Sequence, residues 1–275
     1  MRFIAMMVVT GLGLVFVGSG EKAADIGDAS AEAVEPAAMV MEGWQYLSLE
    51  HDGETYPYAV YRPRGLSQDA EAPAILFLHG RGECGTNGSL MLAQGLPLSV
   101  LRNPEPWPAV MVVPQKPDFD LQWSEYAEPV MKMLDLAIDA HNVDGSRVTL
   151  TGLSQGGHGA MIIGARHADR FAKVAPVCGY AAWLSNEDGR TWNNDADSAL
   201  AQEIIEGLRD TPTWFFHGEE DTVVPPEQSV IVHEALKAAG AETRLTLYPD
   251  VGHGAWGPAY SDPELAAWLV IEADE

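Results

Sequence analysis

The apolar positions of the chain fall into short runs separated by longer amphipathic segments. Two extended runs, near 44–51 and 56–62, flank the turn signal Asp52-Gly53 and predict a β-hairpin at the edge of a sheet. The next runs lack strict alternation of polar and apolar residues, which is typical of strands buried on both faces. These runs are 74–78, 109–113, 147–151, 173–177 and 213–216, with a last strand near 243–248.

Helical periodicity lies between these strands. It predicts helices over 126–141, 155–168 and 227–239, and a last helix near 263–271. Strands and helices that alternate along a chain form a mostly parallel sheet with helices on both faces. The pattern therefore predicts an α/β fold of about eight strands, with a functional site at the carboxyl ends of the strands.

The amino-terminal part of the chain differs in composition. Residues 3–17 form an apolar run behind Arg2, followed by small residues at 18–20, as in an export signal. A membrane anchor is the less favoured alternative, because the run is shorter than the roughly 20 residues of a spanning helix. Residues 21–41 are rich in Ala, Asp and Glu, which predicts a flexible linker. We therefore expect a signal peptide over 1–20, a linker over 21–41 and one domain over 42–275, in a secreted or periplasmic protein.

The charge of the chain excludes one class of partner. Forty acidic residues outnumber sixteen basic residues, and the formal net charge is -24. A polyanion would be repelled, so we expect no nucleic-acid binding. An acidic surface suits a saline medium and ordinary solubility equally well. The sequence does not decide between these two explanations of the acidic surface. It also does not decide whether Cys84 and Cys178 form a disulfide or stay free.

Candidate chemistry begins directly after the run 147–151. Residues 152–156 read GLSQG, the GxSxG pattern of a nucleophile elbow, between a predicted strand and a predicted helix. Glycines are needed there because side chains two positions either side of the serine would collide with neighbouring backbone. We therefore expect Ser154 to be the nucleophile. The backbone amide of Gln155, at the start of the helix, is the expected first donor of an oxyanion hole.

The loop after the run 74–78 is the candidate for the second donor. It reads HGRGE over 79–83, and its small residues let the backbone amide of Arg81 face a substrate carbonyl. Residues 80–85 also fit GxGxxG, the dinucleotide-binding pattern, which expects an acidic residue about 20 positions further on. The run 109–113 is instead followed by Pro-Gln-Lys. We therefore expect neither a dinucleotide nor any other cofactor, and no metal.

A serine nucleophile needs a base and an acid, in the chain order Ser, Asp, His for this kind of sheet. His253 lies in a glycine-flanked loop after the final strand, whereas His233 falls inside the helical pattern 227–239. We therefore choose His253 as the base. For the acid we choose Asp221, because it precedes the rigid segment TVVPP. The alternatives to it are Glu219, Glu220 and Asp250.

Taken together, these motifs resemble a known family. HGRGE, GLSQGG, HGEEDTVVP and GHGAW, in this order, resemble the phospholipase/carboxylesterase branch of α/β-hydrolases. The stretch 252–268 is similar to the secreted "predicted peptidase" and polyester-depolymerase-like esterases, which are relatives of the prolyl oligopeptidase catalytic domain. The resemblance covers 44–272 and implies an α/β-hydrolase fold with an eight-stranded sheet. The site residues it implies are the triad Ser154, Asp221 and His253, and the oxyanion amides of Arg81 and Gln155.

The expected activity is hydrolysis of short-chain or aromatic carboxylic esters, small or polymeric, through an acyl-enzyme on Ser154. The alternatives within the group are a polyester depolymerase, a feruloyl esterase and a serine peptidase. The alternative from another class is a non-catalytic exported binding protein. Trp123 and Trp256 lie in segments expected to face the site, and are the candidate substrate-binding residues. The stretch 180–196 is long enough for a partial lid.

Overall fold

The structure, a computed structural model, describes residues 41–67, 71–186 and 189–271, which fall within one structural unit, Met39–Glu275. The signal peptide predicted over 1–20 and the linker predicted over 21–41 therefore concern residues outside the described part, apart from Met41. Both stay predictions, as does the domain boundary at 42. Within the described residues, no helix is both long enough and apolar enough to cross a membrane.

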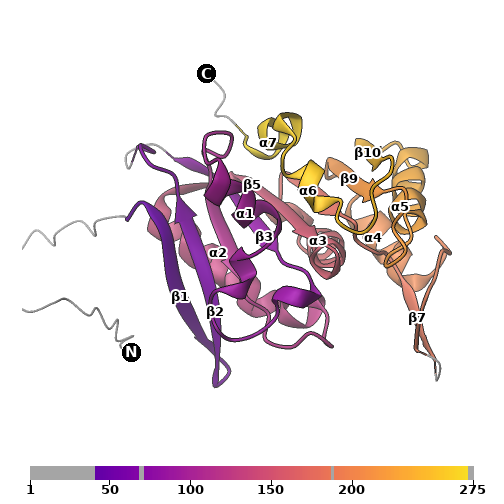
Figure 1. The fold of residues 1–275 in the computed structure, drawn as a ribbon, viewed down its shortest axis with the longest axis horizontal. Coiled ribbons are helices and arrows are strands. Elements are labelled where there is room, and N and C mark those ends of the chain that lie inside the picture. Colours follow the sequence, from indigo (N-terminus) through magenta and orange to yellow (C-terminus); the bar gives the residue numbers. More distant parts are fainter. Residues whose placement is uncertain (1–40, 68–70, 187–188, 272–275) are drawn as a thin grey trace, which may run out of the picture. The chain divides into compact units, whose positions relative to one another are not determined.

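Eight strands form one sheet in the described part of the chain, in the order β1-β2-β4-β3-β5-β6-β9-β10 (Figure 1). β1 and β2 form an antiparallel hairpin at one edge, β2 is antiparallel to β4, and the other pairs are parallel. The strands are β1 Gly43–His51, β2 Glu54–Arg62, β3 Ala72–Leu78, β4 Val110–Pro114, β5 Val143–Leu153, β6 Lys173–Val177, β9 Thr213–Gly218 and β10 Thr243–Tyr248. The predicted edge hairpin and mostly parallel sheet are confirmed.

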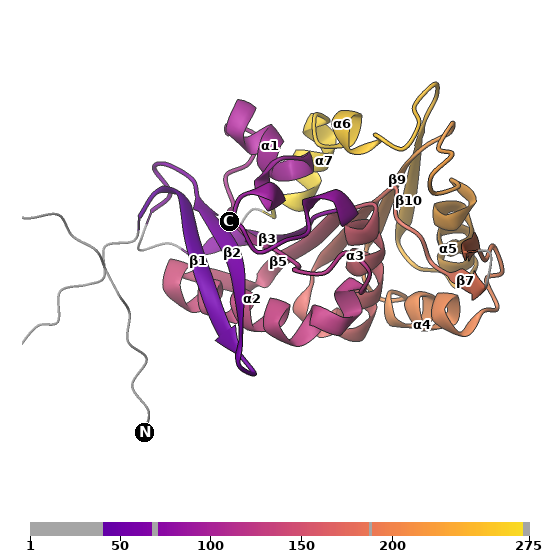
Figure 2. The same cartoon turned by 60° about the horizontal axis from the view of Figure 1, so that its bottom comes forward.

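Helices cover both faces of this sheet (Figure 2). One face packs against α2 Ala127–His141, α3 Gln155–Arg166, α4 Ala199–Gly207 and α5 Glu227–Ala238, and the other against α1 Gly95–Arg102, α6 Trp256–Ala259 and α7 Pro263–Leu269. In β3, Leu76 and Leu78 belong to the first core. Ile75 and Phe77 belong to the second. Burial on both faces explains why the central strands show no polar alternation.

A separate hairpin interrupts the stretch 180–196, which the sequence predicts as irregular. β7 Trp183–Asn186 pairs antiparallel with β8 Gly189–Trp192, outside the main sheet. The two four-residue strands are too short and too polar to stand out as strands in the sequence. The chain then enters α4, where the side chain of Ser198 caps the helix by accepting a hydrogen bond from the amide of Ala201. The lid role of this stretch stays a prediction.

The predicted site residues come from the carboxyl ends of parallel strands, as expected for an open α/β sheet. Arg81 follows β3, Ser154 follows β5, Asp221 follows β9 and His253 follows β10. β5 lies between β3 and β6 in the middle of the sheet. Ser154 is therefore flanked on one side by the Arg81 loop and on the other by the loops of Asp221 and His253.

Candidate active site

Ser154 occupies a sharp turn between β5 and α3. Its φ and ψ are 53° and -114°, a conformation that costs a non-glycine residue energy. The turn is tight enough to exclude side chains from its flanks. A Cβ on Gly156 would lie 2.0 Å from the carbonyl oxygen of Leu78, and one on Gly152 would lie 2.3 Å from that of Gly156. The steric reason for the GxSxG glycines is confirmed.

Ser154, His253 and Asp221 lie in one chain of hydrogen bonds. The Ser154 Oγ is 2.8 Å from His253 Nε2, and His253 Nδ1 is 2.7 Å from Asp221 Oδ2. An ionised carboxylate can only accept, so the imidazole donates through Nδ1, and Nε2 of the neutral ring is left to accept the serine proton. The His253 side chain is 19% exposed and that of Asp221 is fully buried. The imidazole is therefore open to a substrate, while the carboxylate is shielded from water.

Hydrogen bonds keep Asp221 ionised in spite of its burial. Its Oδ1 accepts from the amides of Val223 and Val224, at 2.8 and 2.9 Å. Burial alone would raise the pKa of this carboxyl. Hydrogen bonds from His217, His253 and Val224 outweigh that effect, and hold the pKa well below its ordinary range. Asp221 therefore carries a negative charge next to the His253 ring at neutral pH.

The other candidates for the acid and the base do not belong to this chain of hydrogen bonds. Glu219, Glu220 and Asp250 are exposed. His233 lies in α5, where its Nδ1 is 3.0 Å from the hydroxyl of Thr243. Among the described contacts of the His253 ring, Asp221 is the one carboxylate. The geometry thus agrees with the choice of Asp221 and His253.

The two amides predicted to hold an oxyanion both border the serine turn. Gln155 begins α3, and Arg81 begins a single 3-10 turn, Arg81–Glu83. A Cβ on Gly80 would lie 2.7 Å from the side chain of Leu153, so the loop of Arg81 packs directly against the residue before the serine. Within the described part of the chain, neither amide donates a hydrogen bond to another protein group. The role of both amides as oxyanion donors stays a prediction.

His79 is a functional residue that the sequence reasoning missed. It is fully buried at the end of β3. Its Nδ1 donates to the carbonyl of Gly80 at 2.7 Å, and its Nε2 accepts from the amide of Lys116 at 3.0 Å. Burial lowers its pKa to about 3, so the ring is neutral. His79 ties the start of the Arg81 loop to the loop after β4.

His217, also missed, has a similar position at the end of β9. Its Nε2 lies 2.9 Å from the carbonyl of Val224 and 3.2 Å from Asp221 Oδ2. Both of these neighbours are acceptors, so Nε2 carries a hydrogen, and Nδ1 lies 2.7 Å from the hydroxyl of Ser229. His217 and His253 thus both contact the same oxygen of Asp221, Oδ2. The signal in the sequence is the pair His-Gly, which stands at the carboxyl end of a buried strand in both cases.

The prediction that Trp123 binds substrate is wrong. The ring is fully buried, and its Nε1 donates to the carbonyl of His79 at 3.0 Å. A Cβ on Gly159 of α3 would come within 2.7 Å of the Trp123 side chain. The residue begins a 3-10 turn, Trp123–Tyr126, which directs its side chain inward against α3. Trp123 therefore supports the Arg81 loop from behind.

Trp256 does border the site. It is half-buried, and its ring stands perpendicular to the ring of His253, with 5.5 Å between the centroids. Its Nε1 donates to Gln94 Oε1 at 3.1 Å, which fixes the ring orientation. The location agrees with the predicted substrate contact, and the contact itself stays a prediction.

Neither cysteine is in a disulfide, which answers the question that the sequence left open. Burial raises the pKa of both thiols, and Cys178 is fully buried. A thiol with a raised pKa is a poor nucleophile at neutral pH. Among the described residues, no three His, Cys, Asp or Glu side chains lie close enough together to hold a metal ion.

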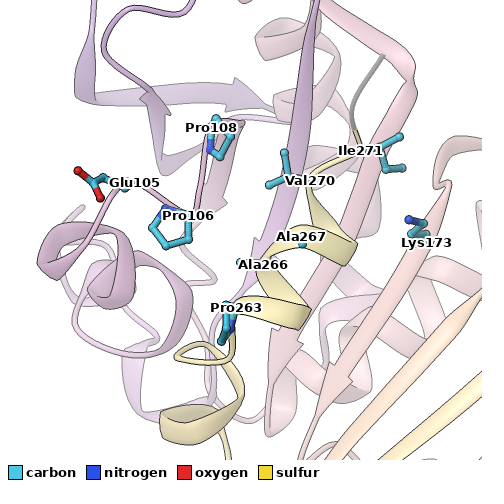
Figure 3. Close-up of a pocket in the computed structure, with 9 residues that line it drawn as sticks. All are labelled: Glu105, Pro106, Pro108, Lys173, Pro263, Ala266, Ala267, Val270 and Ile271. Atoms are coloured by element: carbon cyan, nitrogen blue, oxygen red, sulfur yellow. The ribbon is translucent and has the colours of Figure 1, made fainter. Parts of the chain in front are cut away.

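Several cavities of the described residues lie away from the serine. One of about 540 Å³ is lined by residues of α7 and by Lys173 at the start of β6 (Figure 3). It therefore lies near the amino ends of the strands, opposite the triad. Three further cavities of about 340 to 630 Å³ also include no triad residue.

Comparison with known proteins places the chain in a family. The model of the prolyl oligopeptidase family matches residues 124–270, more than half of the chain, and this range contains Ser154, Asp221 and His253. The chain belongs to the prolyl oligopeptidase family. The predicted relationship to that family and to α/β-hydrolases is therefore confirmed.

Curated relatives of this prolyl oligopeptidase family member include both esterases and peptidases. An acyl-protein thioesterase 1 of Gibberella zeae is 32% identical over 111 residues, which are 40% of this chain and 42% of that protein. A dipeptidyl-peptidase 5 of Porphyromonas gingivalis is 26% identical over 241 residues, covering 74% of this chain and 33% of that protein. The chain thus spans about a third to two fifths of the length of these relatives.

Solved structures agree on the fold. A thermostable esterase is 26% identical, with a TM-score of 0.66 over 82% of this chain and 62% of that one. A ferulic acid esterase is 17% identical, with a TM-score of 0.62 over 84% of this chain and 99% of that one, a likeness of fold alone. The prolyl oligopeptidase family member described here thus has the α/β-hydrolase fold, and the esterase and thioesterase activities are those of the proteins it resembles.

Proposed function

We propose that this chain is an exported serine carboxylesterase that hydrolyses short-chain or aromatic carboxylic esters through an acyl-enzyme on Ser154. The observation that carries the proposal is the hydrogen-bonded chain from Ser154 Oγ through His253 to Asp221, with distances of 2.8 and 2.7 Å. Such a chain activates a hydroxyl that is otherwise a weak nucleophile.

In the proposed reaction, Ser154 Oγ attacks the ester carbonyl carbon while its proton passes to His253 Nε2. The carbonyl electron pair moves onto oxygen, and the amides of Arg81 and Gln155 stabilise the oxyanion. The tetrahedral intermediate then collapses, the bond to the alcohol breaks, and the alcohol leaves with the proton from His253. Water repeats these steps on the acyl-enzyme, and the acid and free Ser154 are released. Asp221 stabilises the imidazolium in both halves.

The proposed preference for small or flat acyl groups over long fatty chains is tested by comparing esters of different acyl length. The 26% identity to a thermostable esterase supports ester substrates. A polyester depolymerase or a feruloyl esterase would use the same chemistry, so both remain within the proposal. The peptidase alternative draws on the dipeptidyl-peptidase relative, of which the match spans a third.

A substrate panel on one purified sample tests the proposal. We expect kcat/KM for p-nitrophenyl acetate and butyrate to exceed that for p-nitrophenyl palmitate and for a peptide p-nitroanilide. Ser154→Ala is the control and should lose the turnover of every substrate in the panel. A preference for palmitate would contradict the proposed acyl range, and a preference for the anilide would favour a peptidase. Turnover that survives in Ser154→Ala would exclude the proposed mechanism.

Export is part of the same proposal. Its support is the apolar run 3–17 behind Arg2, which has the composition of a signal peptide. Expression of the full chain in a bacterial host, followed by amino-terminal sequencing, tests it. We expect the protein in the periplasm or the medium, with a new amino terminus near residue 20. A chain that retains residues 1–20 in the cytoplasm would contradict export.

A further inference from the structure

Two apolar side chains stand exposed beside the residues proposed to hold the oxyanion. Phe119 is 48% exposed and Leu121 is 41% exposed. Both lie in the loop 117–122, between β4 and the 3-10 turn that begins at Trp123. Single exposed apolar residues are common on protein surfaces. Phe119 and Leu121 differ from such residues in their location and in the hydrogen bonds that hold their loop in place.

The loop contacts both proposed oxyanion residues. The side-chain amide of Gln155 donates to the carbonyls of Phe119 and Leu121, at 3.1 and 3.2 Å. The guanidinium of Arg81 lies over the Phe119 ring, 4.4 Å from its centroid, and pairs with Asp120 at 3.2 Å. Since Gln155 directly follows Ser154, the loop 117–122 is attached to the turn that carries the nucleophile.

The loop is also held in place from inside. Lys116 is buried, and its ammonium donates to the carbonyl of Leu121 at 2.8 Å and to that of Asp118. The amide of Asp120 donates to Asp118 Oδ1 at 2.7 Å. A loop braced before the substrate arrives loses little conformational entropy on binding. Its exposed side chains therefore act as a preformed contact surface.

The chemistry of the proposed reaction decides which half of the ester this surface meets. The leaving alcohol takes its proton from His253, so it must lie on the His253 side, where Trp256 stands. The loop 117–122 adjoins the opposite residues, Arg81 and Gln155. The oxyanion points at the amides of Arg81 and Gln155 and the alcohol at His253, so the acyl group takes the remaining direction, for which the loop 117–122 is the candidate neighbour.

We infer that Phe119 and Leu121 form the acyl-side wall of the site and favour aromatic acyl groups over small ones. The inference rests on the proposed esterase function. One face of the Phe119 ring is covered by the Arg81 guanidinium, and the exposed remainder offers an aromatic acyl group an offset or edge-to-face contact. Leu121 adds apolar area beside it.

The test is the ratio of kcat/KM for p-nitrophenyl benzoate to that for p-nitrophenyl acetate, two esters with the same leaving group. We expect Phe119→Ala to lower this ratio roughly fivefold to tenfold, and Leu121→Ala roughly twofold to threefold. Leu136→Ala is the matched control, because Leu136 is 44% exposed on α2, away from the triad. It should leave the ratio unchanged.

The outcomes separate this inference from the proposed function. If the wild type hydrolyses both esters and Phe119→Ala and Leu121→Ala keep its ratio, the acyl-side assignment is wrong and the esterase survives. If Phe119→Ala instead changes the preference among acetate esters of different alcohols, the loop contacts the leaving group, and the assignment of sides is overturned. If the wild type hydrolyses neither ester, the proposed function fails and the inference falls with it.

Discussion

Two loops of this molecule begin with the same pair, His-Gly, at the end of a parallel strand. His79-Gly80 follows β3, and His217-Gly218 closes β9. Both imidazoles are fully buried. His79 bonds only uncharged backbone groups, whereas His217 bonds the carboxylate of Asp221. The same local motif thus positions amides in one loop and a charge in the other.

The two glycines differ in a similar way. A Cβ on Gly80 would meet the end of the Leu153 side chain at 2.7 Å, and that side chain can move. A Cβ on Gly218 would meet the carbonyls of Val251 and Gly252, at 2.2 and 2.3 Å. These carbonyls belong to the loop that carries His253. The β9 loop is therefore packed backbone to backbone against the base, and we expect it to tolerate less change than the β3 loop.

The largest effect should come from the charge in the β9 loop. Asp221→Asn keeps the shape of the side chain but removes the carboxylate that fixes the His253 tautomer, so we expect kcat/KM for p-nitrophenyl acetate to fall about 10⁴-fold. Glu219→Gln and Glu220→Gln are the controls, since both carboxylates are exposed in the same loop. We expect those two variants to stay within about twofold of wild type. If Glu220→Gln is the crippling change, the acid is misassigned.

The next largest effect should come from the different steric surroundings of Gly218 and Gly80. Gly218→Ala forces a methyl group into backbone, and should lower the free energy of unfolding by roughly 3 kcal/mol or more. Gly80→Ala displaces a side chain instead and should cost about 1 kcal/mol. Urea unfolding of both variants measures the difference. Equal losses would show that the two loops are equally constrained.

The pH dependence of stability should reveal the burial of His79. The pKa of His79 is about 3 in the folded protein because the ring is buried, against an ordinary value of 6.5. The unfolded chain therefore binds a proton at this site as the pH falls below about 6.5, and the folded chain does not, so stability is full above that pH and declines below it. We expect His79 to account for roughly 2 kcal/mol of stability lost between pH 7 and pH 5.

His79→Gln is the variant for that measurement, because a glutamine oxygen can still accept from the Lys116 amide. Urea unfolding at several pH values between 5 and 7 should give a shallower decline for this variant than for the wild type. A slope that His79→Gln leaves unchanged would mean that other groups carry the acid sensitivity.

The smallest expected effect concerns His217 as a positioning residue. His217→Ala removes one of the hydrogen bonds to Asp221, so we expect kcat to fall roughly tenfold while KM changes little. His217→Gln, whose side-chain amide can donate to the same oxygen, should recover part of the loss. A merely structural role would lower the stability of both variants without this difference in kcat.

Those parts of the molecule that depend on local sequence pattern could be predicted from the sequence. β6 and β10 stand where their apolar runs indicate, and GxSxG predicts the turn at Ser154 because only glycine fits beside it. Asp221 could be chosen over its acidic neighbours because it alone leads into the rigid segment with Pro225 and Pro226.

The orientation and the burial of individual side chains could not be predicted, because they depend on contacts with residues far away in the chain. Trp123 lies in a segment that the sequence predicts to face the site, yet its ring turns inward against α3. His79 and His217 are revealed only by their contacts with Lys116 and Ser229. The exposure of Phe119 likewise follows from the bracing of its loop by Gln155 and Lys116.

Covalent labelling tests the central claim most directly. A fluorophosphonate reacts with a serine hydroxyl that a neighbouring base activates, and peptide mass spectrometry locates the adduct. We expect a single adduct in the wild type, on the peptide that contains Ser154, and none in Ser154→Ala. An adduct on another serine, or no labelling of the folded wild type, would contradict the assignment of Ser154 as the nucleophile of this prolyl oligopeptidase family member.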